Sequence, residues 1–486
     1  LPEIVSRLEF LQEVGLGYLT LNRQSNSLSG GESQRINLAT SLGSSLVGSM
    51  YILDEPSIGL HPKDTTKLIK VLRSLRDVGN TVIVVEHEED IMQAADEILD
   101  IGPMAGVYGG EIVFQGTHKK LINAKNSLTA DYLTGKEKIP VPSTRRKTKN
   151  KLTIEGACLH NLKNIDVSFP LNSLVCVTGV SGSGKSTLIK NILLPIVRKH
   201  LGIYGDKQGD FRSFSGDLTH IKAVEFVDQN PIGKSSRSNP ITYVKAFDDI
   251  RELYSRLPLA KTRGCKPGFF SFNVEGGRCE VCEGEGEITV GMQFMADVHL
   301  TCEQCNGTRY KNETLDIEFQ GKSISDLLEM DIQSAYDFFS QFDERIEKKI
   351  MQKIEPLVKV GLGYLKLGQA SSTLSGGEAQ RIKLASFLSK GKSSAPTLFI
   401  FDEPTTGLHF HDVNKLVIAF NELINAGHSI IVIEHNLDVV KCADYVIDLG
   451  PEGGVNGGEI VFMGTPEEMI QCEASHTGHY LKEKLL

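Results

Sequence analysis

One unit of the sequence occurs twice, and this repeat restricts the fold more than any other feature. Five segments from the first part of the chain return in the same order in its last part: VGLGYLTL (14–21) as VGLGYLKL (360–367), LSGGESQRINLA (from Leu28) as LSGGEAQRIKLA (from Leu374), YILDEPSIGLH (51–61) as FIFDEPTTGLH (399–409), IVVEH (83–87) as IVIEH (431–435), and GGEIVFQGT (109–117) as GGEIVFMGT (457–465). Ordered matches of this kind indicate a duplicated domain. We therefore expect two copies of one fold in a chain of 486 residues, which is long enough for two hydrophobic cores.

Each copy has the sequence pattern of an α/β fold. An apolar strand ends in an acidic pair, a glycine turn leads into an amphipathic helix, and a second apolar strand ends in Glu-His. Strands that alternate with helices in this way form a mainly parallel sheet flanked by helices. We assign residues 1–135 to the C-terminal part of the first copy and residues 152–486 to the second copy.

The two copies are joined by KEKIPVPSTRRKTKNK, residues 136–151. Two prolines and a cluster of basic residues are typical of a solvated linker. We expect this basic linker to act as a solubilising segment, with a contact to DNA as the alternative.

Composition excludes several classes of protein. Hydrophobic residues make up 40% of the chain and charged residues 23%, as in ordinary globular proteins. The longest apolar runs have strand length, far short of the roughly 20 residues that cross a membrane, and we expect no signal peptide. The chain opens LPEIVSRLEF, without Met, and we expect it to be cut from a longer protein.

Cysteine content and charge narrow the setting further. Nine cysteines, four of them in two C-x-x-C pairs, indicate a reducing compartment and a metal rather than disulfides. We expect a cytoplasmic protein without a membrane segment. The net charge of −9 gives no general support to nucleic-acid binding, so any DNA surface must be local.

A glycine-rich loop is the sharpest motif of the second copy. The strand-like LVCVT runs into GVSGSGKST (179–187), which fits G-x-x-x-x-G-K-[ST], and an apolar helix follows. The glycines let successive backbone N–H groups face phosphates, the lysine reaches the β- and γ-oxygens, and the serine can ligate Mg²⁺. We expect ATP and Mg²⁺ to be held by Gly179, Ser181, Gly182, Gly184, Lys185, Ser186 and Thr187.

Catalytic groups are expected near the ends of neighbouring strands. LFIFDEP ends in Asp402, which suits the Mg²⁺ shell, and in Glu403, which is placed to orient or deprotonate the attacking water. His435 closes SIIVIEH and is expected near the γ-phosphate. Gln229, in FVDQNPIG, is a candidate contact for the water or the Mg²⁺ ion.

The segment LSGGESQRINLA looks like the signature of ATP-binding cassettes, in which the signature of one half closes over the nucleotide held by the other. A helix that opens with Ser-Gly-Gly directs its N–H groups and its dipole at a phosphate. We expect Ser29, Gly30 and Gly31 to cap the nucleotide bound at Lys185. The mirrored set has no glycine loop within the chain and would need residues upstream of Leu1; it consists of Asp54, Glu55, His87 and Ser375–Gly377.

An insertion, which we place at residues 250–370, interrupts the second copy. Its four paired cysteines have the spacing C-x₂-C-x₁₉-C-x₂-C, typical of structural zinc, and are Cys279, Cys282, Cys302 and Cys305. A glycine turn follows each pair, and the residues between the pairs alternate like a hairpin. Four thiolates leave no open position, so we expect a closed structural Zn²⁺ site, with a redox pair as the alternative.

DNA binding by the insertion is not evident from its charge. From Arg251 to Lys311 there are eight basic and eight acidic residues. Three phenylalanines at 269, 270 and 272 could stack on bases, but we expect them in the core. Lys266, in the same segment, could contact a phosphate.

With these motifs the chain resembles the UvrA family, the damage-recognition ATPases of the UvrABC excinuclease in bacterial nucleotide excision repair. Three features carry the resemblance: the four-cysteine insertion between GVSGSGKST and LSGGEAQRIKLA, the segment FVDQNPIGKSSRSNPITY, and the His that ends DEPSIGLH and DEPTTGLH, where transporter cassettes usually carry Asp. It covers essentially the whole chain, aligned to about the C-terminal half of the family. It implies an α/β protein with tandem ATP-binding-cassette domains, the first incomplete, that hydrolyses ATP and has no nuclease site.

The resemblance also implies partners. Members of this family dimerise, bind distorted double-stranded DNA and load the helicase-like protein UvrB. The resemblance implies Lys266, Arg278 and residues 237–239 as candidates for contact with DNA. The N-terminal insertion through which the family mainly grips UvrB is absent from this sequence, which puts loading by this chain in doubt. Three other functions stay open: a family paralogue in drug self-resistance, a transport or ribosome-associated cassette ATPase, and a non-hydrolysing zinc scaffold that uses ATP only to set its shape.

Overall fold

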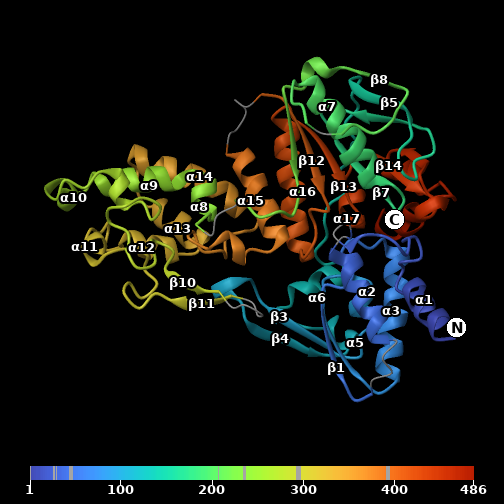
Figure 1. Cartoon of the computed structure of the whole chain (residues 1–486), viewed down its shortest axis with the longest axis horizontal. Coiled ribbons are helices and arrows are strands. Elements are labelled where there is room, and N and C mark those ends of the chain that lie inside the picture. The colour runs from blue at the N-terminus through green and yellow to red at the C-terminus, as the bar shows by residue number, and fades with distance from the viewer. Residues whose placement is uncertain are drawn as a thin grey trace. The chain divides into compact units, whose positions relative to one another are not determined.

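The computed structural model describes residues 2–25, 28, 30–42, 47–205, 207–233, 237–291, 297–389 and 395–485. The chain forms two compact units, which are treated separately below (Figure 1). The first comprises Leu1–Met104, Gly109–Asp228 and Lys392–Leu486, and the second comprises Ala105–Tyr108 and Gln229–Gly391. Among the described residues, no helix is long and apolar enough to cross a membrane.

A six-stranded sheet of the second copy forms the centre of the first unit. Its strands lie in the order β15 (Glu459–Gly464), β14 (Tyr445–Gly450), β7 (Leu174–Gly179), β13 (Ser429–Ile433), β12 (Thr397–Asp402) and β9 (Ala223–Val227). All neighbours are parallel except β15, which is antiparallel to β14. Figure 1 shows β7 between β13 and β14, although about half of the chain separates β7 from these two strands in the sequence. The register aligns the carboxyl ends of β7, β12 and β13, so the predicted motifs meet at one edge.

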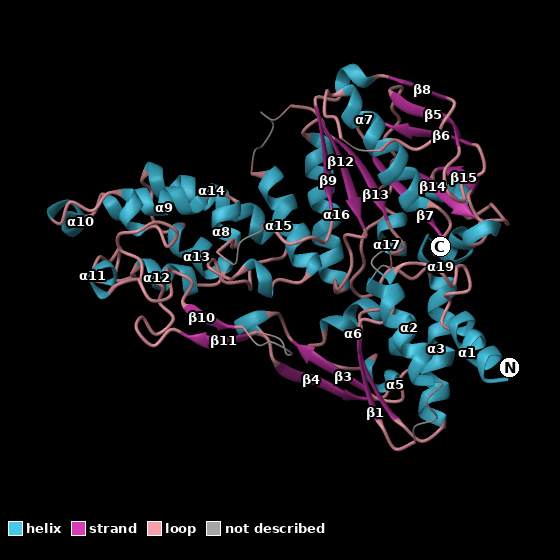
Figure 2. Ribbon diagram, viewed as in Figure 1, coloured by secondary structure: helices cyan, strands magenta, loops and turns pink. Residues whose placement is uncertain are grey.

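Helices and a smaller sheet cover both faces of this sheet (Figure 2). The antiparallel strands β6 (Ile165–Pro170), β5 (Lys151–Ala157) and β8 (Ser213–Gly216) share one apolar cluster with the π-helical turn η3 (Thr187–Leu193) and α7 (Leu194–His200). On the sheet itself, α16 (Phe410–Asn425) contacts β13 and β7. The remaining helical segments are η4 (Leu218–His220), α17 (Leu437–Val440), η8 (Gly454–Asn456), α18 (Pro466–Met469) and α19 (His476–Leu485).

The first copy repeats part of this plan. It contains the parallel pair β1 (Met50–Asp54) and β2 (Thr81–Val85), the antiparallel pair β3 (Ile98–Gly102) and β4 (Glu111–Gly116), and the helices α1 (Pro2–Glu13), α2 (Gly30–Leu42), α3 (Pro62–Asp77), α4 (Glu89–Ala94), α5 (His118–Leu121) and α6 (Leu128–Leu133). On α3, Leu68, Val71, Leu72 and Leu75 are buried, which is the helical spacing of an apolar face.

Side chains on one face of β1 and β3 are exposed to solvent, whereas the corresponding side chains of β12 and β14 are buried. Ile52 is 68% exposed, whereas the repeated Ile400 is fully buried. Ile101 is also 68% exposed, whereas Leu449 is 1% exposed. The buried residues pack in the cluster formed with β5, β6, β7 and η3. Within the described residues the first copy has no counterpart of those elements, as the prediction of an incomplete first domain implies.

The expectation of a solvated linker is wrong at its two arginines. Arg145 donates to the carbonyl oxygens of Lys441 (2.8 Å) and Ala443 (3.0 Å) and pairs with Glu467. Arg146 pairs with the buried carboxylate of Asp444 at 3.1 Å. Composition could not indicate this docking, because the partners follow the linker by about 300 residues in the sequence.

Arg145→Ala is expected to lower the free energy of unfolding of the first unit by about 2–3 kcal/mol, because charged hydrogen bonds to a side chain only 8% exposed are lost. Hydrogen exchange of the β14 amides in a urea series measures the change. Lys147→Ala, at an exposed position of the same linker, is the control. Equal stability of the two variants would contradict the docking.

The second unit is mainly helical. Its elements are α8 (Pro240–Tyr243), α9 (Ala246–Ser255), α10 (Pro258–Thr262), η5 (Pro267–Phe270), α11 (Asn312–Leu315), α12 (Ile324–Glu329), α13 (Ile332–Phe339), α14 (Arg345–Lys359), η6 (Ser371–Thr373), α15 (Gly376–Leu388), the short η2 (Gly106–Tyr108) and the hairpin β10 (Glu287–Val290) and β11 (Val298–Thr301). Contacts of α14 with α9, α13 and α15 build its core. The predicted hairpin is confirmed, with 292–296 outside the described residues.

Candidate nucleotide site and zinc centre

The glycine loop connects β7 to η3 and wraps around its own lysine. Lys185 Nζ donates to the carbonyl oxygens of Gly179 (2.8 Å) and Val180 (2.9 Å). Burial lowers the pKa of Lys185 to about 8, and the nearby Glu403 carboxyl opposes this shift. A curled backbone around a cationic side chain suits polyphosphate. Ser186, where the helix begins, is exposed and can reach a Mg²⁺ ion.

Two glycines of the loop admit no side chain. Gly179 has φ +133°, and a Cβ there would lie 2.0 Å from the carbonyl oxygen of Leu449. Gly182 has φ +75°, and its Cβ would lie 2.6 Å from the ring of Tyr18. Because Tyr18 belongs to the first copy, the loop already touches the other half of the predicted composite site.

Asp402 and Glu403, the acidic pair at the end of β12, lie in two different environments. Asp402 Oδ2 pairs with Lys190 Nζ at 2.6 Å, a cation held where Mg²⁺ chemistry is expected. Glu403 has φ +47°, a conformation that costs an ordinary residue about 1–3 kcal/mol. Its N–H donates to the carbonyl oxygen of Ile433 at 2.9 Å, which holds the backbone in place. Glu55, the repeated residue, has φ +46°, so the strain belongs to the motif.

His435 follows β13 and faces the same carboxyl. Its Nε2 lies 4.0 Å from Oε1 of Glu403, and the residue is 7% exposed. Burial holds the pKa of His435 well below its usual range, and the charge of Lys185 adds to the effect. Its Nδ1 has no hydrogen-bond partner among the described residues. The ring is therefore neutral, with a buried nitrogen that suits a phosphate oxygen or a water.

The turn DEPSIGLH of the first copy closes the site. A Cβ on Gly59 would lie 3.0 Å from Oε2 of Glu403, and the Gly59 carbonyl accepts from Ser181 Oγ at 3.3 Å. The signature helix α2 packs on this turn, since a Cβ on Gly31 would lie 2.5 Å from the carbonyl oxygen of Ile58. Gly30 begins α2, and Ser29 lies outside the described residues. Gly31 thus reaches the loop through the turn.

The repeat makes the same contact in the opposite direction. A Cβ on Gly407, in DEPTTGLH, would lie 2.8 Å from Oε1 of Glu55. The rings of His409 and His87 are 6.4 Å apart, and those of His61 and His435 are 6.0 Å apart. Residues of both turns and both acidic motifs line a cavity of about 320 Å³. The turn of each copy therefore lies next to the strand-end glutamate of the other, Glu403 or Glu55.

The titration of this site sets an expected pH profile. Burial, with Asp402 adding to it, raises the pKa of Glu403 to about 7, and burial lowers that of Lys185 to about 8. A base must be deprotonated and a phosphate-binding lysine protonated, so kcat/KM for ATP should rise through about pH 7 and fall through about pH 8. Initial rates at constant ionic strength measure it. A profile that is flat across this range would contradict these environments.

Gln229 belongs to the second unit, whereas the other predicted catalytic residues belong to the first. A Cβ on Gly376, where the second signature helix begins, would lie 2.9 Å from Cβ of Gln229. Its part in catalysis stays a prediction.

The four paired cysteines converge as the spacing predicts. The Sγ atoms of Cys279 and Cys302 are 3.9 Å apart, those of Cys282 and Cys305 are 3.6 Å apart, and all four lie within 4.8 Å of one another. Zn–S bonds of about 2.3 Å in a tetrahedron place sulfurs about 3.8 Å apart, whereas a disulfide needs about 2.05 Å. The four thiols therefore fit one structural Zn²⁺ ion. Gly284 makes the turn after the first pair, since a Cβ there would lie 2.0 Å from the carbonyl oxygen of Phe272.

The candidate DNA-contact residues of the second unit differ in exposure and in their hydrogen-bond partners. Arg237 pairs with Glu283 at 3.2 Å, and Arg278 donates to the Glu283 carbonyl oxygen at 3.2 Å. Lys266 is exposed. Phe270 and Phe272 are fully buried, which confirms their place in the core. Of the set, Lys266 is the side chain most open to a phosphate.

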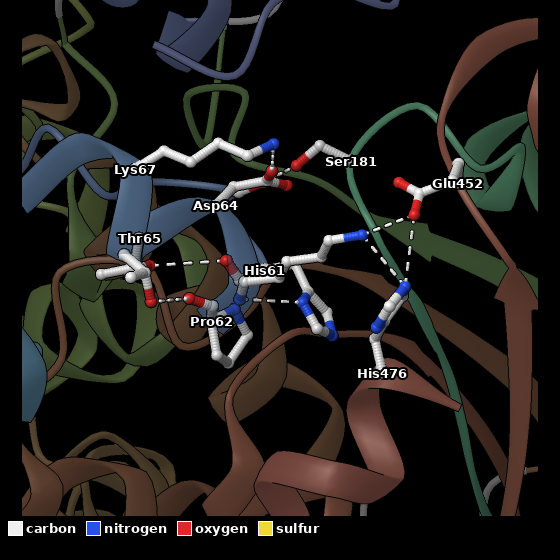
Figure 3. A network of polar contacts seen from close by, with 11 residues as sticks. His61, Pro62, Asp64, Thr65, Lys67, Ser181, Glu452 and His476 are labelled. Carbon is white, nitrogen blue, oxygen red and sulfur yellow. Dashed lines mark hydrogen bonds and ion pairs between the residues drawn. The ribbon is translucent and has the colours of Figure 1, made fainter. Parts of the chain in front are cut away.

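Three residues of the site were not predicted from the sequence. Tyr18 contacts the glycine loop, Lys190 pairs with Asp402, and the ring of His61 lies 6.0 Å from that of His435. Figure 3 shows His61 within a network of polar contacts. The signal for His61 and Tyr18 was their repetition, as His409 and Tyr364. Lys190 lies one turn beyond the end of the motif, where no pattern marks it.

No protein-family model matches the chain. Known proteins, however, match it along its whole length. UvrABC system protein A of Aquifex aeolicus is 54% identical over 486 residues, all of this chain and 52% of that protein. The Clostridium tetani protein of the same name is 54% identical and is covered to 51%. The crystal structure of UvrA2 from Deinococcus radiodurans matches with a TM-score of 0.92 and 45% identity over all of this chain and 58% of that one.

A more distant likeness concerns the fold alone. The ribosome-bound archaeal Pelota and ABCE1 model matches with a TM-score of 0.55 and 18% identity over 96% of this chain and 61% of that one. Tandem ATP-binding-cassette domains, the first incomplete, thus describe the fold. The chain spans about half the length of the curated relatives that it matches. Over that span the chain is similar to the proteins named UvrABC system protein A.

Proposed function

We propose that this chain hydrolyses ATP at a composite site formed by its two copies. The observation that carries the proposal is Glu403, which lies beside the Lys185 loop of its own copy and against Gly59 of the other. Glu403 takes the proton of the attacking water, and His435 holds the water or the γ-phosphate. Lys185 and the loop N–H groups bind the phosphates.

Mg²⁺ fits at Ser186 and Asp402, where it would neutralise charge on the β- and γ-phosphates. Lys190 holds the Asp402 carboxylate in position beside the loop. The DEPSIGLH turn lies next to the Glu403 carboxyl, and α2 packs on this turn. These contacts support turnover that depends on closure of one copy on the other.

Gly31→Asp is expected to lower kcat for ATP at least tenfold. Its Cβ would lie 2.5 Å from the Ile58 carbonyl oxygen, so the turn must shift and Gly59 leaves Glu403; displacement of a positioning group by about 1 Å can cost a factor of about 100. Steady-state kinetics provides the measurement. The control is Gly377→Asp, at the repeated position, whose glycine loop is not within the chain. Equal rates for the wild type and Gly31→Asp would rule out the composite site.

We also propose that the ATPase serves damage recognition in nucleotide excision repair. Support comes from 54% identity to UvrABC system protein A over the entire chain. Distorted duplex DNA is then the ligand, and Lys266 the first residue to test. The zinc centre would hold the surrounding second unit in shape. The same similarity supports a homodimer and a cytoplasmic location as parts of this proposal. Delivery of UvrB belongs to it only for a protein that also carries the N-terminal insertion.

Fluorescence anisotropy with a labelled duplex tests this role. At one fixed salt concentration we expect tighter binding to a lesion-bearing duplex than to the undamaged duplex, because salt alone changes phosphate-driven affinity. Lys266→Ala should weaken both, and Lys147→Ala should not. Equal affinity for the two duplexes would favour the paralogue or another soluble cassette ATPase over damage recognition.

A further inference from the structure

His61 is held in a buried chain of hydrogen bonds that joins the two copies. It is fully buried where α3 begins, and its Nδ1 accepts from the N–H of Lys63 at 3.1 Å. Its Nε2 lies 3.1 Å from Oγ1 of Thr477, and Thr477 donates to Oδ1 of Asp448 at 3.1 Å. Ser475 donates to the other oxygen of Asp448 at 2.6 Å. Figure 3 shows the start of α3 facing Glu452 and His476.

The direction of this chain is fixed by chemistry. A backbone N–H can only donate, so Nδ1 of His61 must be the unprotonated nitrogen. A neutral ring then carries its proton on Nε2 and donates it to Thr477, whose own proton goes to the carboxylate. Burial, with Lys185 adding to it, lowers the pKa of His61 to about 3, so the ring is neutral. Every donor meets an acceptor.

The same chain occurs in the other direction. His409, where α16 begins, accepts from the N–H of His411 at 3.3 Å, and its Nε2 lies 3.2 Å from Oγ1 of Thr129. Thr129 donates to Asp100 at 3.0 Å, and Ser127 donates to it at 2.6 Å. The two networks use the same residue types at repeated positions. A general N-cap would need only the bond to its own helix, so the extra link to the other copy calls for a different role.

Both ends of the His61 chain lie at the nucleotide site. The His61 ring meets the His435 ring edge-on at 6.0 Å. Asp448 is in β14, beside β7, and its charge acts on Lys185. Gly59, two residues before His61, lies so close to Glu403 that a Cβ there would be 3.0 Å from Oε2 of the carboxyl. Movement of His61 would therefore move the turn that faces the catalytic carboxyl.

We propose that His61 is a positioning residue for ATP hydrolysis: its hydrogen bond to Thr477 locks the DEPSIGLH turn of the first copy onto the second, so that Gly59 stays against Glu403. This inference rests on the proposed hydrolysis of ATP at Lys185. Both ring nitrogens of His61 are already hydrogen-bonded, Nδ1 to the Lys63 N–H and Nε2 to Thr477. His61 therefore orders the turn without binding ATP.

Kinetics of matched variants separates positioning from simple stability. His61→Ala and Thr477→Val are each expected to lower kcat about tenfold, a change in barrier of about 1.4 kcal/mol, with KM for ATP within about twofold. His61→Gln should recover most of the rate, because its amide can donate from near the Nε2 position. Thr66→Val makes the same change as Thr477→Val at a position on α3 outside the network and should retain the wild-type rate.

Two outcomes would overturn the inference while the wild type remains active. The first is an unchanged kcat in Thr477→Val. The second is a loss in His61→Gln as large as that in His61→Ala. A wild-type chain without turnover would instead refute the proposed function.

The hydrogen-bonded ring can be tested without activity. In protein labelled with [15N]histidine, the His61 signal, assigned by its loss in His61→Gln, is expected to show the Nε2–H tautomer. Thr477→Val should shift this signal. An Nδ1–H tautomer would refute the chain of bonds, whether or not the protein hydrolyses ATP.

Discussion

Glu403→Gln is expected to lower kcat for ATP by a factor of about 100 to 1,000, with ATP binding retained, because an amide of the same size cannot accept the proton of the attacking water. The surroundings of Glu403 restrict where another group could take over its role. Its backbone is held at φ +47°, and its carboxyl lies close to Gly59 and His435. Steady-state kinetics and equilibrium binding of a fluorescent ATP analogue provide the two measurements.

Glu55→Gln is the matched control for this experiment. It makes the same change at the repeated position, which has nearly the same φ and faces Gly407, but whose glycine loop is not within the chain. We expect a change of less than about threefold in this variant. Unchanged turnover in Glu403→Gln would remove Glu403 as the partner of the water. A chain that only binds ATP to set its shape would then be the better description.

Removal of zinc is expected to unfold the cysteine turns of the second unit and leave the first unit folded. Structural Zn²⁺ contributes about 10–16 kcal/mol to small zinc-binding peptides, and the four thiols form a buried cluster of their own within the part of the chain that the structure describes. Chelation should release about one zinc per chain, and hydrogen exchange should rise around β10 and β11 while the β7 and β12 amides stay protected.

Cys302→Ser should reproduce this result, because it removes one ligand from the fully buried position of the cluster. Cys265→Ser changes a cysteine outside the cluster and serves as the control. Cooperative loss of both units on chelation would contradict a local role for the metal. Zinc content equal in the two variants would contradict the ligand set.

Motifs that act through local chemistry could be predicted from the sequence. The glycine loop, Asp402 and Glu403 follow strands whose apolar runs are unambiguous, and the ends of parallel strands meet at one edge. The four-cysteine cluster is indicated by two short spacings, and the hairpin between them by its alternation. In each case the information lies within a few residues of the side chain concerned.

Contacts between distant segments could not be predicted in the same way. Arg145 looks like any linker arginine until its acceptors at 441 and 443 are known. His61 and Thr477 are separated by 416 residues, and no sequence motif around either residue indicates that the two are in contact. That Gly31 caps a phosphate stays a prediction, whereas its closeness to the Ile58 carbonyl oxygen of the DEPSIGLH turn has no signal in the sequence. Packing decides such pairs.

Steady-state ATP turnover of this chain, measured without DNA, with an undamaged duplex and with a lesion-bearing duplex at one salt concentration, tests the central claim most directly. Lys185→Ala, which removes the phosphate-binding ammonium, gives the background. The composite site predicts turnover well above that background, and the proposed role predicts a rate that changes with the lesion and not with the undamaged duplex. Turnover equal to the Lys185→Ala background under all three conditions would contradict the claim that the two copies form a working ATPase.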